Sequence, residues 1–330
     1  MRSNKINSIL TKWYFQLGIL LVTLFLFLIF RNPIFGFLVG IELIVMVIFE
    51  IKYGAKKHGW KHELLDTVIA LFVALFIWYL ASFLLNTGSP LSAVASCSML
   101  SNLQRGDFVV VQGSKINAHE ISMTEAGFAA IKDDAIIFYG DKQLSTVKGS
   151  IYSYCNSFSG DSVCREFINA PEQFIEKKGP LTFHYSRCEL ATEAGLKYVP
   201  CVTSVDYAGK DYKQSFDNDI IVYTPTKGDI FSVIGDIVHR SYFKITTDTG
   251  NVYYLSKGDN NPVFDIQFYD YKYNAGNSPV NSNNVKGKVV TRIPYLGYFK
   301  LLITPAIDHK GQITSLGVMD IEQCKTQLKP

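Results

Sequence analysis

Three long apolar segments in the first 85 residues constrain the fold of this chain more than any other feature. They cover residues 13–30, 33–51 and 63–85, and each is close to the roughly 20 residues that a helix needs to cross a bilayer. A cleavable signal peptide is the alternative for the first segment, but this segment is longer than the apolar part of such a peptide and no small-residue cleavage site follows before Arg31. We therefore expect a membrane domain of residues 1–85 with three transmembrane helices.

The uneven placement of basic residues predicts how these helices are oriented. The basic residues are Arg2, Lys5 and Lys12 before the first segment and Lys52, Lys56, Lys57 and Lys61 between the second and third. The connection between the first and second segments has only Arg31. By the positive-inside rule, the N-terminus and the second connection are cytoplasmic, and everything after residue 85 is extracytoplasmic. The expected localisation is a cell membrane with a multi-pass anchor.

The region after residue 85 is predicted to be mainly β. It contains short β-branched or aromatic runs closed by Gly, Pro, Asn or Asp, such as "DFVVVQG", "AIIFYG", "DIIVYTP", "NVYYLSKG" and "KVVTRIPYLG". No long segment there has a helical period. The polar stretch 273–287 is predicted to be an exposed, flexible loop. The small net charge of +3 does not indicate a nucleic-acid partner.

Six cysteines, all in the region predicted to be extracytoplasmic, favour disulfide bonds. Two local bonds, Cys155–Cys164 and Cys188–Cys201, are the preferred pairing among the three that these four residues allow. A zinc site is the alternative, but the spacings do not match paired short Cys-x-x-Cys motifs and no histidine is adjacent. Cys97 and Cys324 are predicted to be free, with a bond between them as the less favoured case.

The segment "ASCSMLSNLQRGDFVVV", residues 95–111, contains the first candidate for a catalytic residue. A nucleophile at Ser98 would act near the membrane surface, because even an extended chain keeps it within about 45 Å of the end of the third helix. A serine needs a base, an orienting acid and an oxyanion donor to react. His239 in "DIVHRSYF" and two aspartates in "YLSKGDNNPVFD", Asp259 and Asp265, are the candidates. Each of these features alone favours an ordinary structural role, such as a hairpin connection.

Together these motifs resemble the type I signal peptidases. The order Ser-x-Ser-Met, Val-His-Arg and Lys-Gly-Asp-Asn-Asn-x-x-x-Asp is similar to the archaeal and endoplasmic-reticulum branch, which uses histidine where the bacterial branch uses lysine. The segments "LQRGDFVVV", "DIIVY" and "VVTRIPYLGY" also match. The resemblance covers residues 95–112 and about 217–300. Its specificity comes from four motifs in the right order behind a helix of the expected orientation.

The resemblance implies a membrane-bound serine endopeptidase that removes N-terminal signal peptides from exported preproteins after small residues. Ser98 would attack the scissile carbonyl, His239 would act as general base, and Asp265 would orient the histidine. Asp259 would support Asp265 by hydrogen-bonding the backbone of their shared turn. The Ser96 hydroxyl and the backbone N–H of Ser98 would stabilise the oxyanion. No metal or cofactor is implied, and the expected partners are preprotein signal peptides and the lipid bilayer.

The chain departs from the family pattern within the serine motif. Cys97, Leu100 and Ser101 replace the glycine, acidic residue and proline that the family usually has, which changes the expected shape of the substrate groove. A large insertion also separates the matching segments. The predicted organisation after the membrane domain is a catalytic β domain of residues 86–112 and 217–305, an inserted disulfide-bearing region of residues 113–216, and a C-terminal tail of residues 306–330.

Two other functions fit the same motifs. One is a specialised processing protease for a few surface or pilin-like proteins, which the changes in the serine motif would suit. The other is a catalytically inactive, membrane-anchored binding protein, which the presence of all four of Ser98, His239, Asp259 and Asp265 disfavours. If the enzyme instead uses the serine–lysine chemistry of the bacterial branch, the alternative bases are Lys227 and Lys257.

Overall fold

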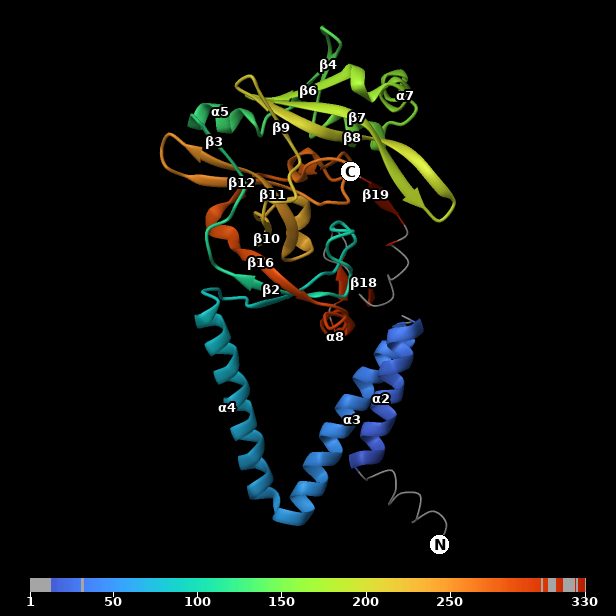
Figure 1. The fold of residues 1–330 in the computed structure, drawn as a ribbon, viewed down its shortest axis with the longest axis vertical. Coiled ribbons are helices and arrows are strands. Elements are labelled where there is room, and N and C mark those ends of the chain that lie inside the picture. The colour runs from blue at the N-terminus through green and yellow to red at the C-terminus, as the bar shows by residue number, and fades with distance from the viewer. Residues whose placement is uncertain are drawn as a thin grey trace.

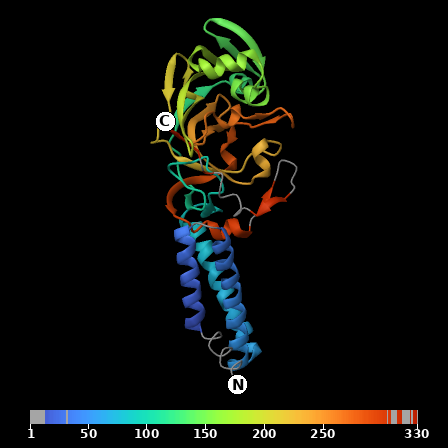
Figure 2. The same ribbon diagram turned by 90° about the vertical axis from the view of Figure 1, so that its right-hand side faces the viewer.

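A computed structural model describes residues 13–30, 33–303, 305–307, 313–316, 324 and 326–329. Long helices lead into a mainly β part, and the two views of the ribbon place all of the long helices on one side of it (Figures 1 and 2). The mainly β character predicted for the region after residue 85 is therefore confirmed. Four basic residues used to predict the orientation, namely Arg2, Lys5, Lys12 and Arg31, lie outside the described residues.

The apolar segments form the helices α2 (Trp13–Phe30), α3 (Pro33–His58) and α4 (Trp60–Leu84). Among the described residues, α4 is the one helix that is long and apolar enough to cross a membrane. None of its side chains is buried within the protein, so apolar groups face outward on every side, as in a lipid-exposed helix. Helix α3 continues past the predicted end at residue 51. That α2 and α3 also cross a membrane stays a prediction.

An aromatic contact joins the long helices to the β part. The ring of Tyr298, at the start of the short helix α8 (Tyr298–Ile303), packs edge-on against Phe27 of α2 with ring centroids 5.4 Å apart. The same ring lies so close to Gly106 that a Cβ there would be 2.0 Å from it, and Gly106 has a φ of +88°. Glycine is therefore required at this turn, which lies between Ser98 and Phe108.

The first of two large sheets in the described residues has eight strands in the order β1-β2-β16-β10-β11-β12-β15, with β3 paired in parallel to β11. Segments far apart in sequence meet here, since β2 pairs with β16. Strand β3 also belongs to this sheet, although it lies in the predicted insertion. The strands are β1 (Leu91–Ala93), β2 (Phe108–Gln112), β3 (His119–Met123), β10 (Ile220–Tyr223), β11 (Ile237–Thr247), β12 (Val252–Lys257), β15 (Val280–Asn281) and β16 (Val285–Ile293).

The second sheet has seven strands in the order β5-β4-β6-β7-β8-β9, with β19 paired to β7. It lies farther from the long helices than the first sheet in both views (Figures 1 and 2). Its strands are β4 (Ala135–Tyr139), β5 (Lys142–Val147), β6 (Phe174–Lys178), β7 (Leu181–Thr192), β8 (Gly195–Tyr207), β9 (Lys210–Lys213) and β19 (Gln327–Lys329), and the helices beside them are α5 (Glu125–Ala130), α6 (Ile151–Ser157) and α7 (Ser162–Asn169).

One hydrophobic core joins the two sheets. Phe183 of β7 packs edge-on against Phe264, which follows β12, with ring centroids 5.4 Å apart. Both rings are fully buried, together with Phe243 and Ile245 of the first sheet and Leu181 of the second. Burial of such side chains is the main stabilising contribution to a protein fold, so the second sheet is packed onto the first as part of one core.

The cysteine predictions are partly confirmed. The bonds Cys155–Cys164 and Cys188–Cys201 are present as predicted. The prediction that Cys97 and Cys324 are free is wrong, because they form a third disulfide with Cα atoms 5.4 Å apart. The pairing of strand β19 with β7 carries the C-terminal residues back to the serine segment and brings these two distant cysteines together. Among the described residues, no group of three or more His, Cys, Asp or Glu is placed to hold a metal ion.

The prediction of an exposed, flexible loop at residues 273–287 is wrong. The stretch contains strand β14 (Ala275–Gly276), which pairs with β13 (Tyr269–Asp270), then strand β15, and the start of β16. Val280 is only 5 % exposed. Polar composition alone does not reveal such short pairings, because each depends on a partner strand elsewhere. The remaining described tail forms β17 (Pro305–Ile307) and β18 (Ile313–Leu316) as well as β19.

Candidate active site

The loop that carries Ser98 is anchored in the core on both sides. Met99 is 1 % exposed and packs with Val109 and Val111 of β2, so the residue after Ser98 is held rigidly. Downstream, the buried carboxylate of Asp107 accepts hydrogen bonds from the backbone N–H of Gln104 at 3.0 Å and from the Arg292 guanidinium at 3.0 Å. The "RGD" turn in the sequence therefore ends the loop and starts strand β2. Ser98 itself stays partly exposed.

His239 lies on the central strand β11, between β10 and β12, and is 4 % exposed. Its Nε2 is 2.8 Å from Ser98 Oγ and its Nδ1 is 2.8 Å from Asp265 Oδ2. Ser98 is 141 residues away in sequence, so only the fold brings the two side chains together. The ring also contacts the ring of Phe231 edge-on, with centroids 6.2 Å apart. The imidazole is thus held in one orientation between a hydroxyl and a carboxylate.

Asp265 begins a single helical turn, η3 (Asp265–Gln267), that follows β12, and its side chain is 3 % exposed. Its Oδ2 accepts hydrogen bonds from the Tyr223 hydroxyl at 2.9 Å and the Ser256 hydroxyl at 2.6 Å as well as from His239. Three donors therefore converge on one oxygen of this buried side chain. Burial and the neighbouring carboxylate of Asp265 raise the pKa of the Tyr223 phenol well above its usual value, so it stays a donor.

These contacts assign the tautomer of His239. Because the Asp265 carboxylate can only accept, Nδ1 carries the hydrogen, and Nε2 is left as the acceptor for the Ser98 hydroxyl. A neutral imidazole in this state can remove the serine proton, and the carboxylate beside Nδ1 stabilises the imidazolium that results. The serine, histidine and aspartate therefore have the geometry of a nucleophile, a base and an orienting acid.

The Ser96 hydroxyl lies beside that of Ser98. Its Oγ is 2.9 Å from Ser98 Oγ, and Ser96 is exposed. The structure thus brings together four of the five predicted site residues, Ser96, Ser98, His239 and Asp265, in one connected chain of hydrogen bonds.

Asp259, the fifth predicted residue, makes different contacts from those expected. We predicted that it would hydrogen-bond the backbone of its own turn; instead both oxygens bind the Arg240 guanidinium, at 2.8 Å each. Its Oδ2 also accepts from Asn102 at 2.7 Å, and its Oδ1 from Gln214 at 3.4 Å. Asn102 belongs to the serine loop and Gln214 follows β9. Asp259 is therefore the centre of a buried junction that joins the serine loop, strand β11 and the end of the second sheet.

The two alternative bases lie in other surroundings. Lys227 is exposed in the connection between β10 and β11. Lys257 is 4 % exposed at the end of β12, and its ammonium donates to Gln214 Oε1 at 3.0 Å. Burial lowers the pKa of Lys257 to about 8, against the opposing effect of nearby aspartates. The Ser98 hydroxyl is hydrogen-bonded to Nε2 of His239 instead.

A buried carboxyl group of the second sheet supports the turn that carries Asp265. Glu176 of β6 is fully buried and accepts a hydrogen bond from the Gln267 side chain at 2.7 Å. The Tyr185 hydroxyl donates to the same carboxyl at 2.7 Å, and the Gln267 carbonyl accepts from the Ser150 hydroxyl at 2.8 Å. Sequence motifs gave no indication of this anchor, because Glu176 lies 91 residues from Gln267 and in the unmatched insertion.

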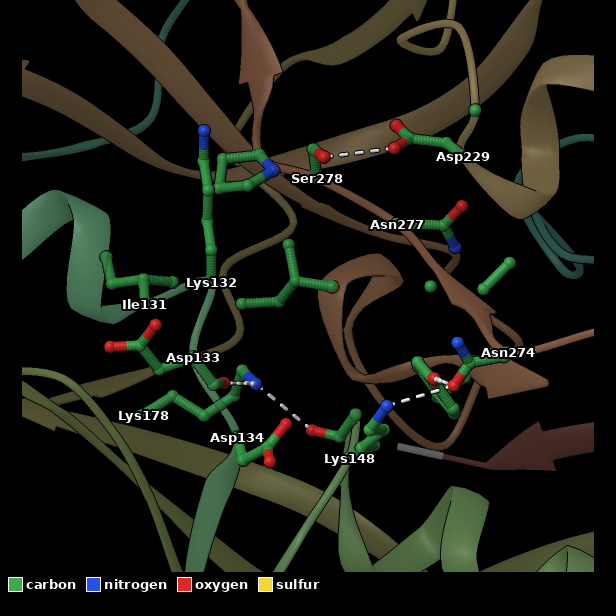
Figure 3. A pocket seen from close by; sticks show the side chains of 17 residues that line it. Ile131, Lys132, Asp133, Asp134, Lys148, Lys178, Asp229, Asn274, Asn277 and Ser278 are labelled. Atoms are coloured by element: carbon green, nitrogen blue, oxygen red, sulfur yellow. Dashed lines mark hydrogen bonds between the residues drawn. The ribbon is translucent and has the colours of Figure 1, made fainter. Parts of the chain in front are cut away.

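A cavity of about 340 Å³ lies behind the same turn, between the two sheets. Three lysines and three aspartates are among its lining residues, and Figure 3 shows that Lys148 reaches Asn274 and that Ser278 reaches Asp229. Lys178 is 3 % exposed and donates to the backbone carbonyls of Asp133 and Gly149. The lining does not include Ser98, His239 or Asp265, so this cavity is separate from the hydroxyl–imidazole–carboxylate chain.

Two comparisons of the sequence with known proteins give no relative. No protein-family model matches the chain, and no curated protein has a similar sequence. A functional assignment therefore depends on the sequence motifs and on the contacts of Ser98, His239 and Asp265.

Proposed function

We propose that this protein is a membrane-bound serine endopeptidase of the signal-peptidase type, which cleaves N-terminal signal peptides from exported preproteins after small residues. The observation that carries the proposal is the hydrogen-bonded chain from Ser98 Oγ through His239 to Asp265, with 2.8 Å at each step. Serine, histidine and aspartate in this connected order are the groups that acyl transfer needs.

The expected mechanism follows from these contacts. Ser98 Oγ attacks the scissile carbonyl carbon while His239 Nε2 takes the hydroxyl proton. The imidazolium then returns that proton to the leaving amine, and the amide bond breaks to leave an acyl-enzyme. A water molecule, activated by the same nitrogen, hydrolyses the ester and restores the serine. The backbone N–H of Ser98 and the Ser96 hydroxyl are the proposed donors to the oxyanion.

The helical part supports a substrate at the membrane. The apolar helix α4 ends at Leu84, and the chain enters the β part at Leu91, shortly before Ser98. A catalytic serine so close to a membrane anchor suits a substrate whose own apolar segment stays in the bilayer. We further propose that α2, α3 and α4 all cross the membrane, with the N-terminus cytoplasmic and the β part extracytoplasmic; three disulfides support an oxidising compartment for the β part.

A narrower substrate range is the second candidate. The Cys97–Cys324 disulfide attaches a C-terminal segment directly beside the nucleophile, where the family usually has a glycine. This favours a processing protease for a few proteins over a general one. In both cases the substrate is a membrane-tethered precursor.

The test uses the full chain in detergent and a panel of preproteins that differ in the residues before the cleavage site. We expect new N-termini after small residues, identified by sequencing, and no cleavage by Ser98→Ala, which loses the hydroxyl at little cost to packing. Cleavage of the whole panel supports the general enzyme, and cleavage of a few members supports the specialised one. No cleavage of any member by the wild-type protein, or undiminished cleavage by Ser98→Ala, would refute the proposal.

A further inference from the structure

Asn260 holds the backbone on both sides of the nucleophile. Its backbone N–H donates to the carbonyl of Ser98 at 2.7 Å, and its side-chain Nδ2 donates to the carbonyl of Cys97 at 3.0 Å. The carbonyl of Cys97 and the N–H of Ser98 belong to one planar peptide group and point in opposite directions. A hydrogen bond that fixes the carbonyl therefore also fixes the direction of the Ser98 N–H, the proposed oxyanion donor.

The remaining polar atoms of the Asn260 amide bind the C-terminal segment. Nδ2 also donates to the carbonyl of Thr326 at 3.1 Å, and Oδ1 accepts from the backbone N–H of Leu328 at 2.5 Å. Nδ2 has two hydrogens, and each has a carbonyl to bind. The amide is thus held in one orientation only while the C-terminal segment stays in place.

Two attachments keep that segment in place. The Cys97–Cys324 disulfide ties it to the serine loop across 227 residues of sequence. Strand β19 pairs with Glu189–Ala191 of β7, and Leu328 within it is 6 % exposed. A chain end without such attachments is usually poorly ordered. The disulfide is the covalent part of this arrangement, and it lies one residue from Ser98.

The turn before Asn260 is fitted to the nucleophile as well. A Cβ on Gly258 would lie 2.7 Å from the carbonyl oxygen of Ser98, so a side chain there would push the serine loop away. The glycine lets the turn approach closely enough for the Asn260 N–H to reach that carbonyl.

We propose that Asn260 is a positioning residue for the Ser98 N–H, and that the Cys97–Cys324 disulfide and strand β19 keep its amide in the working orientation. The inference rests on the proposed serine-protease function, and it assigns a role to the C-terminal segment. Turnover then depends on a disulfide that touches neither substrate nor reacting atoms.

The test compares two variants of the full chain in detergent, each of which lacks one of the three disulfides. Cys97→Ser/Cys324→Ser removes the bond beside Ser98. Cys155→Ser/Cys164→Ser is the matched control, because it removes a bond between helices α6 and α7, beside the second sheet. We expect the first variant to lose about 10- to 100-fold in kcat with KM within about twofold, since a misplaced donor weakens transition-state binding rather than substrate binding. We expect the control to keep the wild-type kcat.

A second readout does not need a preprotein. A fluorophosphonate probe reacts when Ser98 Oγ forms a bond to phosphorus, fluoride leaves, and His239 takes the serine proton; the anionic transition state uses the same oxyanion donor. We expect the labelling rate of Cys97→Ser/Cys324→Ser to fall as much as its kcat. If the wild type is labelled but cleaves no preprotein, the proposed substrate is wrong. The labelling rates then still test whether Asn260 positions the Ser98 N–H. If the wild type neither reacts nor cleaves, both proposals are refuted.

Asn260→Asp separates positioning from folding. The aspartate keeps an acceptor for the Leu328 N–H but cannot donate to the two carbonyls. We expect a similar loss of kcat and of labelling rate, with the melting temperature close to that of the wild type. A lower melting temperature with unchanged kcat, or equal labelling rates for the wild type and Cys97→Ser/Cys324→Ser, would overturn the proposal.

Discussion

The two sheets differ in how their strands are connected along the chain. In the first sheet, β2 pairs with β16, so Val109 lies opposite Arg292, and a strand from the start of the β part lies beside one from near its end. In the second sheet, β6, β7, β8 and β9 pair in the order in which they occur in the sequence. The first sheet therefore brings distant segments together, whereas the second is built almost entirely from neighbouring ones.

The difference matters because the proposed catalytic groups all belong to the first sheet and its connections. Ser98 precedes β2, His239 lies on β11 and Asp265 follows β12. Within the described residues, the hydrogen-bond partners of Ser98 and His239 also come from these segments. The second sheet contacts these groups indirectly. Its Glu176 accepts a hydrogen bond from Gln267, which lies in the same turn as Asp265. We therefore expect substitutions in the first sheet to change turnover and those in the second mainly to change stability.

The largest expected effect is that of Asp265→Asn. The amide matches the shape of the carboxylate but lacks the charge that stabilises the imidazolium, and it no longer enforces the tautomer with hydrogen on Nδ1. We expect turnover to fall by about 10³- to 10⁴-fold while the fold is kept. Asp270→Asn is the matched control, because within the described residues the hydrogen bonds given for that carboxylate come from backbone groups of its own turn, Lys272 at 2.8 Å and Tyr273 at 3.1 Å. An active Asp265→Asn would contradict the assignment.

His239→Ala removes the base itself. We expect a loss of roughly 10²- to 10⁴-fold in kcat, the usual contribution of a general base. Lys257→Met tests the alternative base with a side chain of similar length, and we expect it to keep most of the turnover, because the Lys257 ammonium binds Gln214. A silent His239→Ala beside an inactive Lys257→Met would show that the enzyme uses a lysine.

Asp259→Asn affects the junction between the two sheets. The carboxylate and the Arg240 guanidinium are 2 % and 7 % exposed, and removing one charge leaves the other buried without compensation. We expect the free energy of unfolding to fall by about 3–5 kcal/mol, with a smaller loss of turnover than for Asp265→Asn. Chemical denaturation of both variants measures the first quantity. A stable but inactive Asp259→Asn would mean that the two aspartates have exchanged roles.

The sequence motifs predicted important side chains within the strands of the first sheet better than contacts made by the connections between those strands. The segments "DIIVY" and "VHR", both part of the family resemblance, contain Tyr223 and Arg240, whose side chains bind the two aspartates. Turn composition, by contrast, suggested only local partners for Asp259, and its actual partners come from distant segments. The Cys97–Cys324 bond was only the less favoured prediction for the same reason: it depends on the path of the C-terminal strand, which no local pattern reports.

The smallest expected effect comes from the second sheet, at Glu176. Burial raises the pKa of this carboxyl group above its ordinary value of 4.5, although Gln267, Tyr185 and Lys178 partly offset the shift. A carboxyl group with a raised folded-state pKa contributes stability that is fully present below the unfolded pKa and is lost as pH rises through the folded pKa. Exposed Glu120 has the opposite sign, because its hydrogen bond to Lys244 lowers its pKa.

Thermal unfolding of Glu176→Gln and Glu120→Gln across pH isolates these contributions. The amide does not titrate, so the stability of the wild type relative to Glu176→Gln should be greatest below the ordinary pKa of 4.5 and should shrink as pH rises through the higher pKa of the folded state. The stability of the wild type relative to Glu120→Gln should instead shrink as pH falls below about 5. This change should be smaller, because an exposed ion pair contributes little to stability. Since Glu176 acts on Asp265 only through Gln267, we expect Glu176→Gln to lower turnover by less than about tenfold. A pH-independent stability difference, or a loss of turnover as large as that of Asp265→Asn, would show that the second sheet contributes directly to the chemistry of the first.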